Sequence, residues 1–278
     1  MTRSLKQTTA ALLIVIYLSA CASNSRSIQN SSPQSSYSME EVMLGKQIHE
    51  YIISKMPACE NPQVLTYIQG VGKKLAKFAK RQDLPYQFIV LQDERIYATS
   101  SPGGFVYLTT GAILFAQNEA ELAAILAHEI GELQFKDPRF SHTKSLMKKV
   151  ITGGAVVAPI FGSIGALALI GLVGAYTYMD RGNIQEEHLY KSDKIALKLL
   201  HDAEEDPQGL VDFLRRLLNA TPKELMYLYD YYQTRPVSEA RLTKLEQAFS
   251  ALPFGERSFN TNRNDFLKIT EPLRLTPA

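Results

Sequence analysis

Apolar residues recur every three or four positions in two segments, residues 39–53 and 64–78. A period near 3.6 residues predicts amphipathic helices that each bury one face. Pro57 should end the first helix, because proline cannot continue it. Asn61 and Pro62 favour the start of the second, because asparagine caps a helix and proline suits its first turn.

Shorter β-rich runs follow the two helical segments. Residues 87–92 and Phe105–Thr109 each predict a strand, and a turn at Pro102-Gly103-Gly104 precedes the second strand. Asn118 can cap a third helix, and Glu121 completes a capping-box pattern three residues later. This mixture predicts an α+β fold that is mostly helical with a small β-sheet.

The first twenty residues show the pattern of a bacterial lipoprotein signal. Arg3 and Lys6 precede an apolar run at residues 10–18 that is too short to span a bilayer as a helix. Leu18-Ser19-Ala20-Cys21 then has the order of a lipobox, in which the cysteine is lipidated and the chain is cleaved before it. Acyl chains on Cys21 would anchor the protein to a membrane without a spanning helix. The other interpretation is a simple secretory signal with a chance cysteine.

The segment after the lipobox predicts where the protein lies. Ala22, rather than an aspartate, follows the cysteine, and this favours the outer membrane. Residues 21–38 are rich in Ser, Asn and Gln and indicate a flexible tether. We therefore expect a lipid-anchored protein of the bacterial cell envelope that faces the periplasm.

The composition limits the number of domains, the kinds of partner and the disulfide bonds that we expect. The 278 residues suit one sizeable domain, or one domain with appendages. The chain has 30 basic and 28 acidic residues, and loss of Arg3 and Lys6 with the signal makes the numbers equal, so nothing favours nucleic acid as a partner. The two cysteines are Cys21 and Cys59. Lipidation of the first leaves no partner for the second, which excludes a disulfide framework.

The third predicted helix carries the candidate chemistry. It reads Ala127-His128-Glu129-Ile130-Gly131-Glu132, which departs from the His-Glu-x-x-His pattern of zincins at its fifth position. Residues four apart share one helix face, so both can reach one metal while the first Glu polarises the attacking water. A His-Glu pair alone usually belongs to a solvated face, so the surrounding motifs decide its meaning.

Several of those motifs together, by their order and spacing, resemble the HtpX- and BepA-like zinc metalloendopeptidase family. The resemblance runs from about residue 38 to residue 249. The motifs are Leu44-Gly45, Val71-Gly72, Leu84-Pro85-Tyr86, Ala98, Pro102-Gly103-Gly104-Phe105, Glu121-Leu122-Ala123, Ala127-His128-Glu129, Ser192-Asp193, Asp206-Pro207, Thr234, Pro236 and Arg241.

The resemblance implies a fold, a cofactor and roles for particular residues. It implies a zincin-like (gluzincin) domain with zinc, Glu129 as the catalytic residue and His128 as a metal ligand. Asp193 would support the metal ligands from behind. The turn and strand start at Pro102, Gly103, Gly104 and Phe105 would line the substrate groove.

Three functional positions depart from the family pattern. The family binds zinc with two His and with a Glu four residues before the aspartate of an Ala-Asp pair. The second His position holds Glu132 and the Glu position holds Leu189, while the late His beside the catalytic centre is Arg235. Leucine cannot bind zinc, and a catalytic zinc normally has three protein ligands. We therefore expect weak or absent zinc binding and reduced or lost activity.

An alternative interpretation keeps the metal. Glu132 could bind zinc through its carboxylate, and His188 or Glu186, both close to Leu189 in sequence, could supply the third ligand. The rearranged site would consist of His128, Glu132 and His188, with Glu129 as general base. Neighbouring helical residues point about 100° apart, which disfavours His188. We favour the plainer interpretation, an ion pair of Glu132 with Lys136 and a partly exposed His188 at a helix start.

Residues 150–179 contain no charged side chain, so a membrane span, a membrane-dipping hairpin and a buried helical pair all fit. A single span would place His128 and Asp193 on opposite sides of a membrane, so we favour a helical hairpin near the cleft. The expected organisation is a signal peptide at 1–20, a tether at 21–38, a metallopeptidase-like domain at 39–252 with this insert, and a tail at 253–278.

Two function classes follow. One is an envelope quality-control protein that binds unfolded or envelope proteins in the old substrate groove with little or no catalysis. In this class an exposed edge of the strand Phe105–Thr109 would pair with an extended polypeptide. The other is an active zinc metalloendopeptidase with the rearranged site.

Overall fold

A computed structural model describes residues 37–135, 182–253 and 258–275. The signal peptide, Cys21, almost all of the tether and the uncharged segment 150–179 lie outside the described residues. The chain divides into two units, Met1–Ser35 and Ser36–Ala278, and the second unit is described below. Its elements are α2 (Met39–Lys55), α3 (Pro62–Ala76), β1 (Gln87–Leu91), β2 (Ala98–Ser101), the 3₁₀ turn η1 (Pro102–Gly104), β3 (Phe105–Thr109), α4 (Thr110–Phe115), α5 (Glu119–Leu133), α9 (Gly182–Asp202), α10 (Gln208–Leu218), α11 (Pro222–Thr234), α12 (Glu239–Ser250) and α13 (Arg263–Leu275).

These elements confirm the predicted α+β class, which is mostly helical with a small sheet. Two helix starts carry the predicted caps. Asn61 Oδ1 accepts hydrogen bonds from two first-turn amides at 3.1 Å. Asn118 Oδ1 accepts one from Glu121 N at 2.9 Å, and the Glu121 carboxylate reaches back to the amide of Gln117 rather than to that of Asn118.

The sheet has the strand order β1-β3-β2, with β1 parallel and β2 antiparallel to β3. The prediction that Phe105–Thr109 offers an exposed edge is wrong, because this strand is paired on both sides and all five of its residues are buried. The two edge strands are β1 and β2, and the apolar pattern did not predict β2 because Ala98–Ser101 reads Ala-Thr-Ser-Ser.

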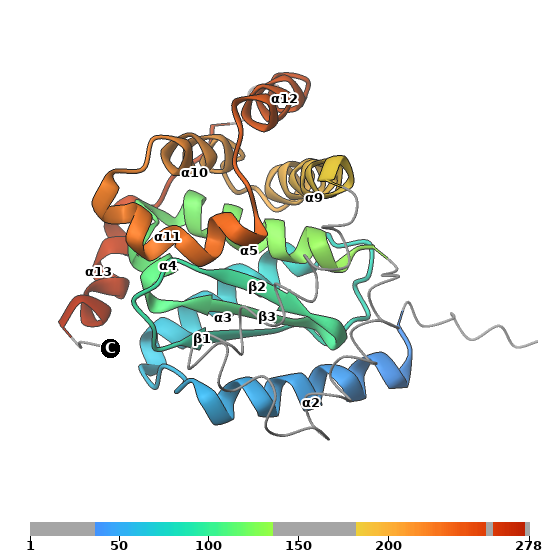
Figure 1. Ribbon diagram of the computed structural model, residues 1–278, viewed down its shortest axis with the longest axis vertical. Coiled ribbons are helices and arrows are strands. Elements are labelled where there is room, and N and C mark those ends of the chain that lie inside the picture. The colour runs from blue at the N-terminus through green and yellow to red at the C-terminus, as the bar shows by residue number, and fades with distance from the viewer. Residues whose placement is uncertain (1–36, 136–181, 254–257, 276–278) are drawn as a thin grey trace, which may run out of the picture. The chain divides into compact units, whose positions relative to one another are not determined.

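Helices cover both faces of the sheet (Figure 1). Phe105 and Tyr107 project from one face and stack on His49 of α2, while α3 packs on β1 and α5 packs on β2. The turn η1 packs against α2, and Gly103 and Gly104 have φ values of 82° and 88°. Only glycine adopts such angles readily, so this turn has a structural task, and its part in binding a substrate stays a prediction.

Helix α5 lies at the centre of the unit, where every residue from Ala120 to Leu133 is buried. Helices α9 and α10 pack on α5, and α12 packs on both of them. Helix α13 lies within the segment expected as a tail, and it packs on α3 and α4 with Phe266 fully buried. A helix buried all round places its polar residues in the core, and this applies to the His-Glu motif.

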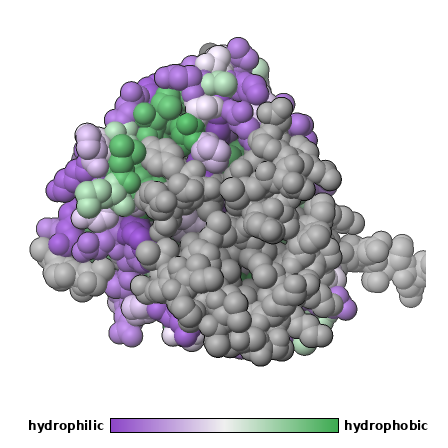
Figure 2. Space-filling model, viewed as in Figure 1, coloured by the Kyte–Doolittle hydropathy of each residue, from purple (hydrophilic) through white to green (hydrophobic). Residues whose placement is uncertain are grey.

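The described surface is mainly hydrophilic in the view of Figure 2, with apolar atoms gathered in the area of α10 and α11. Leu225, Met226 and Tyr227 of α11 are among the large apolar side chains that remain exposed. Among the described helices, none is both long and apolar enough to cross a membrane.

Candidate functional site

Two helices bring the candidate residues together. His128, Glu129 and Glu132 lie on α5, and Asp193 lies on α9. Gly131 permits this packing, because a Cβ atom there would lie 2.8 Å from the Ser192 carbonyl oxygen. The glycine inside the motif therefore lets α9 approach closely enough for its acid to reach the histidine.

His128 is held from behind by a buried acid. Its Nδ1 lies 2.8 Å from Asp193 Oδ1, which favours the tautomer that carries its proton on Nδ1. Arg241 donates to both oxygens of the same carboxylate, from Nε at 2.7 Å and from Nη2 at 2.9 Å. Burial alone would raise the pKa of Asp193, but the charge and hydrogen bonds of Arg241 and the bond from His128 lower it to about 2.

Glu129 is also paired with a guanidinium group. Arg235 Nη2 donates to Glu129 Oε2 at 2.9 Å, and the two side chains are 6% and 2% exposed. Burial raises the pKa of Glu129, and the charge of Glu132 adds to this, whereas Arg235, His128 and a hydrogen bond from Ser100 act against it. The candidate general base is therefore already bound to a permanent cation.

Glu132 faces the centre. Its side chain is buried, and Oε1 lies 3.7 Å from His128 Nε2 and 3.6 Å from His188 Nδ1. Ser192 Oγ donates to the same oxygen at 3.4 Å. Helix α5 buries Glu132, and its expected ion pair with Lys136 stays a prediction, because Lys136 lies outside the described residues.

His188 and Glu186, the two residues that could replace Leu189 as a zinc ligand, make different contacts. Leu189, at that position, is 4% exposed. His188 lies within α9 rather than at its start, contacts the ring of Phe135 at a tilt, and approaches Glu132 to 3.6 Å. Glu186 accepts a hydrogen bond from Ser238 Oγ at 2.6 Å, at the start of α12. The structure therefore brings His188 to the centre and directs Glu186 to another contact.

The residues present do not fit the family's zinc site. The part of the chain that the structure describes contains no group of three or more His, Cys, Asp or Glu side chains arranged to hold a metal ion. His128 and His188 each approach one oxygen of Glu132, and Leu189 offers no donor. One feature favours a metal site. His128 Nε2 is buried without a hydrogen bond, as a nitrogen that binds a metal would be.

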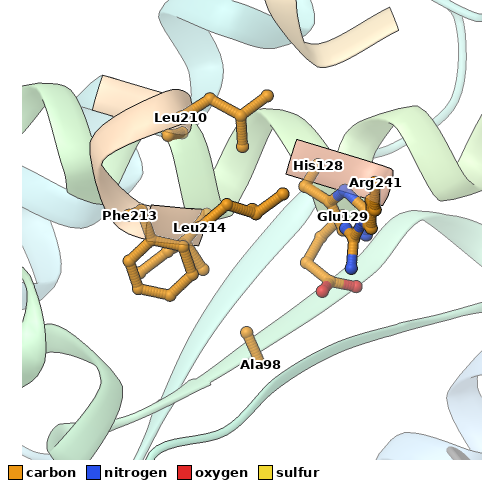
Figure 3. A pocket seen from close by; sticks show the side chains of 9 residues that line it. Ala98, His128, Glu129, Leu210, Phe213, Leu214 and Arg241 are labelled. Carbon is orange, nitrogen blue, oxygen red and sulfur yellow. The ribbon is translucent and has the colours of Figure 1, made fainter. Parts of the chain in front are cut away.

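A pocket lies beside this centre (Figure 3). Leu210, Phe213 and Leu214 of α10 form an apolar wall, and the Glu129 carboxylate points toward the side on which Ala98 of β2 lies. The pocket holds about 260 Å³ of empty space, part of it open to solvent. Most of this volume is open space between the side chains, and the enclosed part has room for about one water molecule.

Comparisons with known proteins agree with the resemblance seen in the sequence. The sequence pattern of the family described as Peptidase family M48 matches residues 62–248. The chain is 24% identical over 213 residues to the beta-barrel assembly-enhancing protease of Escherichia coli (strain K12), which covers 73% of this chain and 42% of that protein. It is 26% identical over 212 residues to the putative beta-barrel assembly-enhancing protease of Vibrio cholerae, with 73% and 43% covered.

A relative of another kind matches as well. The chain is 24% identical over 184 residues to the mitochondrial metalloendopeptidase OMA1 of Schizosaccharomyces pombe, with 65% of this chain and 52% of that protein covered. The chain therefore spans about two fifths to one half of the length of these relatives. The comparisons support a protein of the metalloendopeptidase kind, in a family whose peptidases use zinc.

Proposed function

The chain belongs to peptidase family M48, and on that premise we propose that it is a lipid-anchored protein of the cell envelope that binds unfolded or envelope proteins with reduced or no hydrolysis. The observation that carries the proposal is the edge strand β2 beside a centre in which an arginine, rather than a metal site, faces Glu129. Binding through a strand edge needs no metal, whereas the family's hydrolysis does.

The register of β2 determines which of its backbone groups point away from β3. Thr109 N donates to Tyr97 O at 3.0 Å, so the alternate residue Thr99 also exchanges its hydrogen bonds with β3. Ala98 and Ser100 therefore turn their amide and carbonyl groups away from β3. Within the described residues these outward groups have no backbone partner. An extended polypeptide can pair with such groups by adding a strand to the sheet.

The surroundings of this edge suit an apolar, unfolded partner. Ile96 N donates to Tyr227 O at 2.9 Å, which places α11 beside the start of β2. The exposed Leu225 and Met226 belong to the same helix, and the side chains that line the pocket beside Ala98 are mostly apolar. These features support a binding site beside β2 that recognises the backbone and the apolar side chains of a polypeptide rather than its charged side chains.

Replacing Ser100 with Pro is expected to weaken binding of fluorescently labelled casein roughly tenfold, because it removes one outward donor and adds a ring at the edge. Ser100→Ala is the matched control, since it keeps the amide and loses only the hydroxyl. Thermal unfolding of both variants checks that the fold persists. Equal casein affinity in the unaltered protein and in Ser100→Pro would contradict this binding mode.

The proposed lipid anchor on Cys21 can be tested separately from polypeptide binding. Cys21→Ser should leave the protein unprocessed or release it from membranes, because the acyl chains that hold it there are lost. The measurement is fractionation of cells together with the intact mass of the purified protein. An unmodified Cys21 within a longer chain would rule out the lipid anchor.

The alternative is an active metalloendopeptidase with His128, Glu132 and His188 as ligands and Glu129 as general base. It is favoured by the approach of both imidazoles to one Glu132 oxygen and by the buried, unbonded His128 Nε2. Casein cleavage that a chelator blocks and that His188→Ala abolishes would establish it. The contact between Arg235 and Glu129 is the observation against it.

A further inference from the structure

Three buried carboxylates lie where the C-terminal part of α5 packs on the middle of α9, and two buried guanidinium groups face them. Glu129, Glu132 and Asp193 are at most 8% exposed, and Arg235 and Arg241 are 5% and 0% exposed. Burying a charge without a partner is very costly, so each carboxylate needs a compensating group. The pairing of these charges therefore decides whether the folded domain needs a metal ion to compensate its buried carboxylates.

The two guanidinium groups pair with different carboxylates. The third carboxylate, Glu132, lies near the imidazoles of His128 and His188. Arg241 donates twice to Asp193, at 2.7 and 2.9 Å. Arg235 donates to Glu129 at 2.9 Å and lies over the ring of Tyr97, 5.9 Å from its centroid. The aromatic ring and the carboxylate together hold Arg235 in the centre, because a guanidinium group favours both contacts.

We infer that Arg235 takes the electrostatic place of the metal ion, as the permanent counter-charge of Glu129, so that the folded domain needs no metal. A guanidinium group keeps its proton at any pH that proteins meet, so the compensation does not depend on an added ion. The inference rests on the proposed loss of zinc binding. It concerns stability, so it stands or falls separately from polypeptide binding at β2.

A double-mutant cycle on the full-length protein tests this assignment. Arg235→Met and Glu129→Gln should each lower the Tm by roughly 10 °C, because each leaves one buried partner uncompensated. The double variant should recover most of that loss, because neither charge remains. Arg235→Lys keeps a cation and should lose less than Arg235→Met. If Glu129→Gln alone does not fold, recovery of folded protein in the double variant gives the same support.

The matched control is Arg215→Met, which removes an arginine from an ion pair with Glu246 at the surface. Exposed pairs contribute little, so its Tm should stay close to that of the unaltered protein. A chelator should not change the Tm of the unaltered protein. The inference is overturned if Arg235→Met behaves like the control, if the losses of the two single variants simply add, or if a chelator lowers the Tm.

Discussion

Arg241→Met is expected to lower the free energy of unfolding by about 3–5 kcal/mol, the usual cost of breaking a buried charge pair. Arg241 is fully buried and donates two hydrogen bonds to Asp193, which is fully buried as well. The substitution leaves that carboxylate in the core with the hydrogen bond from His128 but without its cation. Urea unfolding followed by circular dichroism measures the change.

The exposed ion pair of Arg215 provides the comparison, because the same change of residue type there removes no buried charge. A loss in Arg241→Met no larger than that in Arg215→Met would contradict the assigned role. The expected loss is large because Asp193 also orients His128, which lies on α5, where every residue from Ala120 to Leu133 is buried.

Restoring the family pattern should create a metal site. The variant Glu132→His, Leu189→Glu, Arg235→His is expected to bind zinc at least about 100-fold more tightly than the unaltered protein, because it regains the second His, the third ligand and space beside Glu129. It should also cleave casein, since a metal-bound water is far easier to activate than ordinary water. The readouts are zinc titration and a casein gel.

A fourth substitution gives the control for this variant. Adding Glu129→Gln should retain zinc and abolish cleavage, because the general base is lost while the ligands remain. A folded triple variant that binds zinc no better than the unaltered protein would show that more than these three positions separates the chain from its zinc-binding relatives.

Local signals in the sequence predicted much of the fold. The caps Asn61 and Asn118 begin the predicted helices, and the strand Phe105–Thr109 has its predicted bounds. These features depend on residues close together in the chain, which is why periodicity and capping chemistry suffice. Strand β2 escaped prediction because its small polar residues carry no apolar alternation, and its absence from the prediction left β3 wrongly at an edge.

The sequence predicted the candidate site less completely than it predicted the fold. The order of motifs anticipated that Asp193 would lie behind the metal-ligand position, and the structure places it against His128. The contact between Glu129 and Arg235 joins residues 106 positions apart, and no local pattern predicts such a contact. The burial of Glu132 was missed for a related reason, since a Glu spaced four residues from a Lys fits a solvated face until the packing around α5 is known.

Zinc content per chain is the most direct test of the central claim that this member of the family holds no tightly bound catalytic metal. Elemental analysis after dialysis of the purified full-length protein at neutral pH is the measurement. We expect well below one zinc per chain, because Leu189 offers no donor and Arg235 supplies the charge beside Glu129. One tightly held zinc per chain would contradict it.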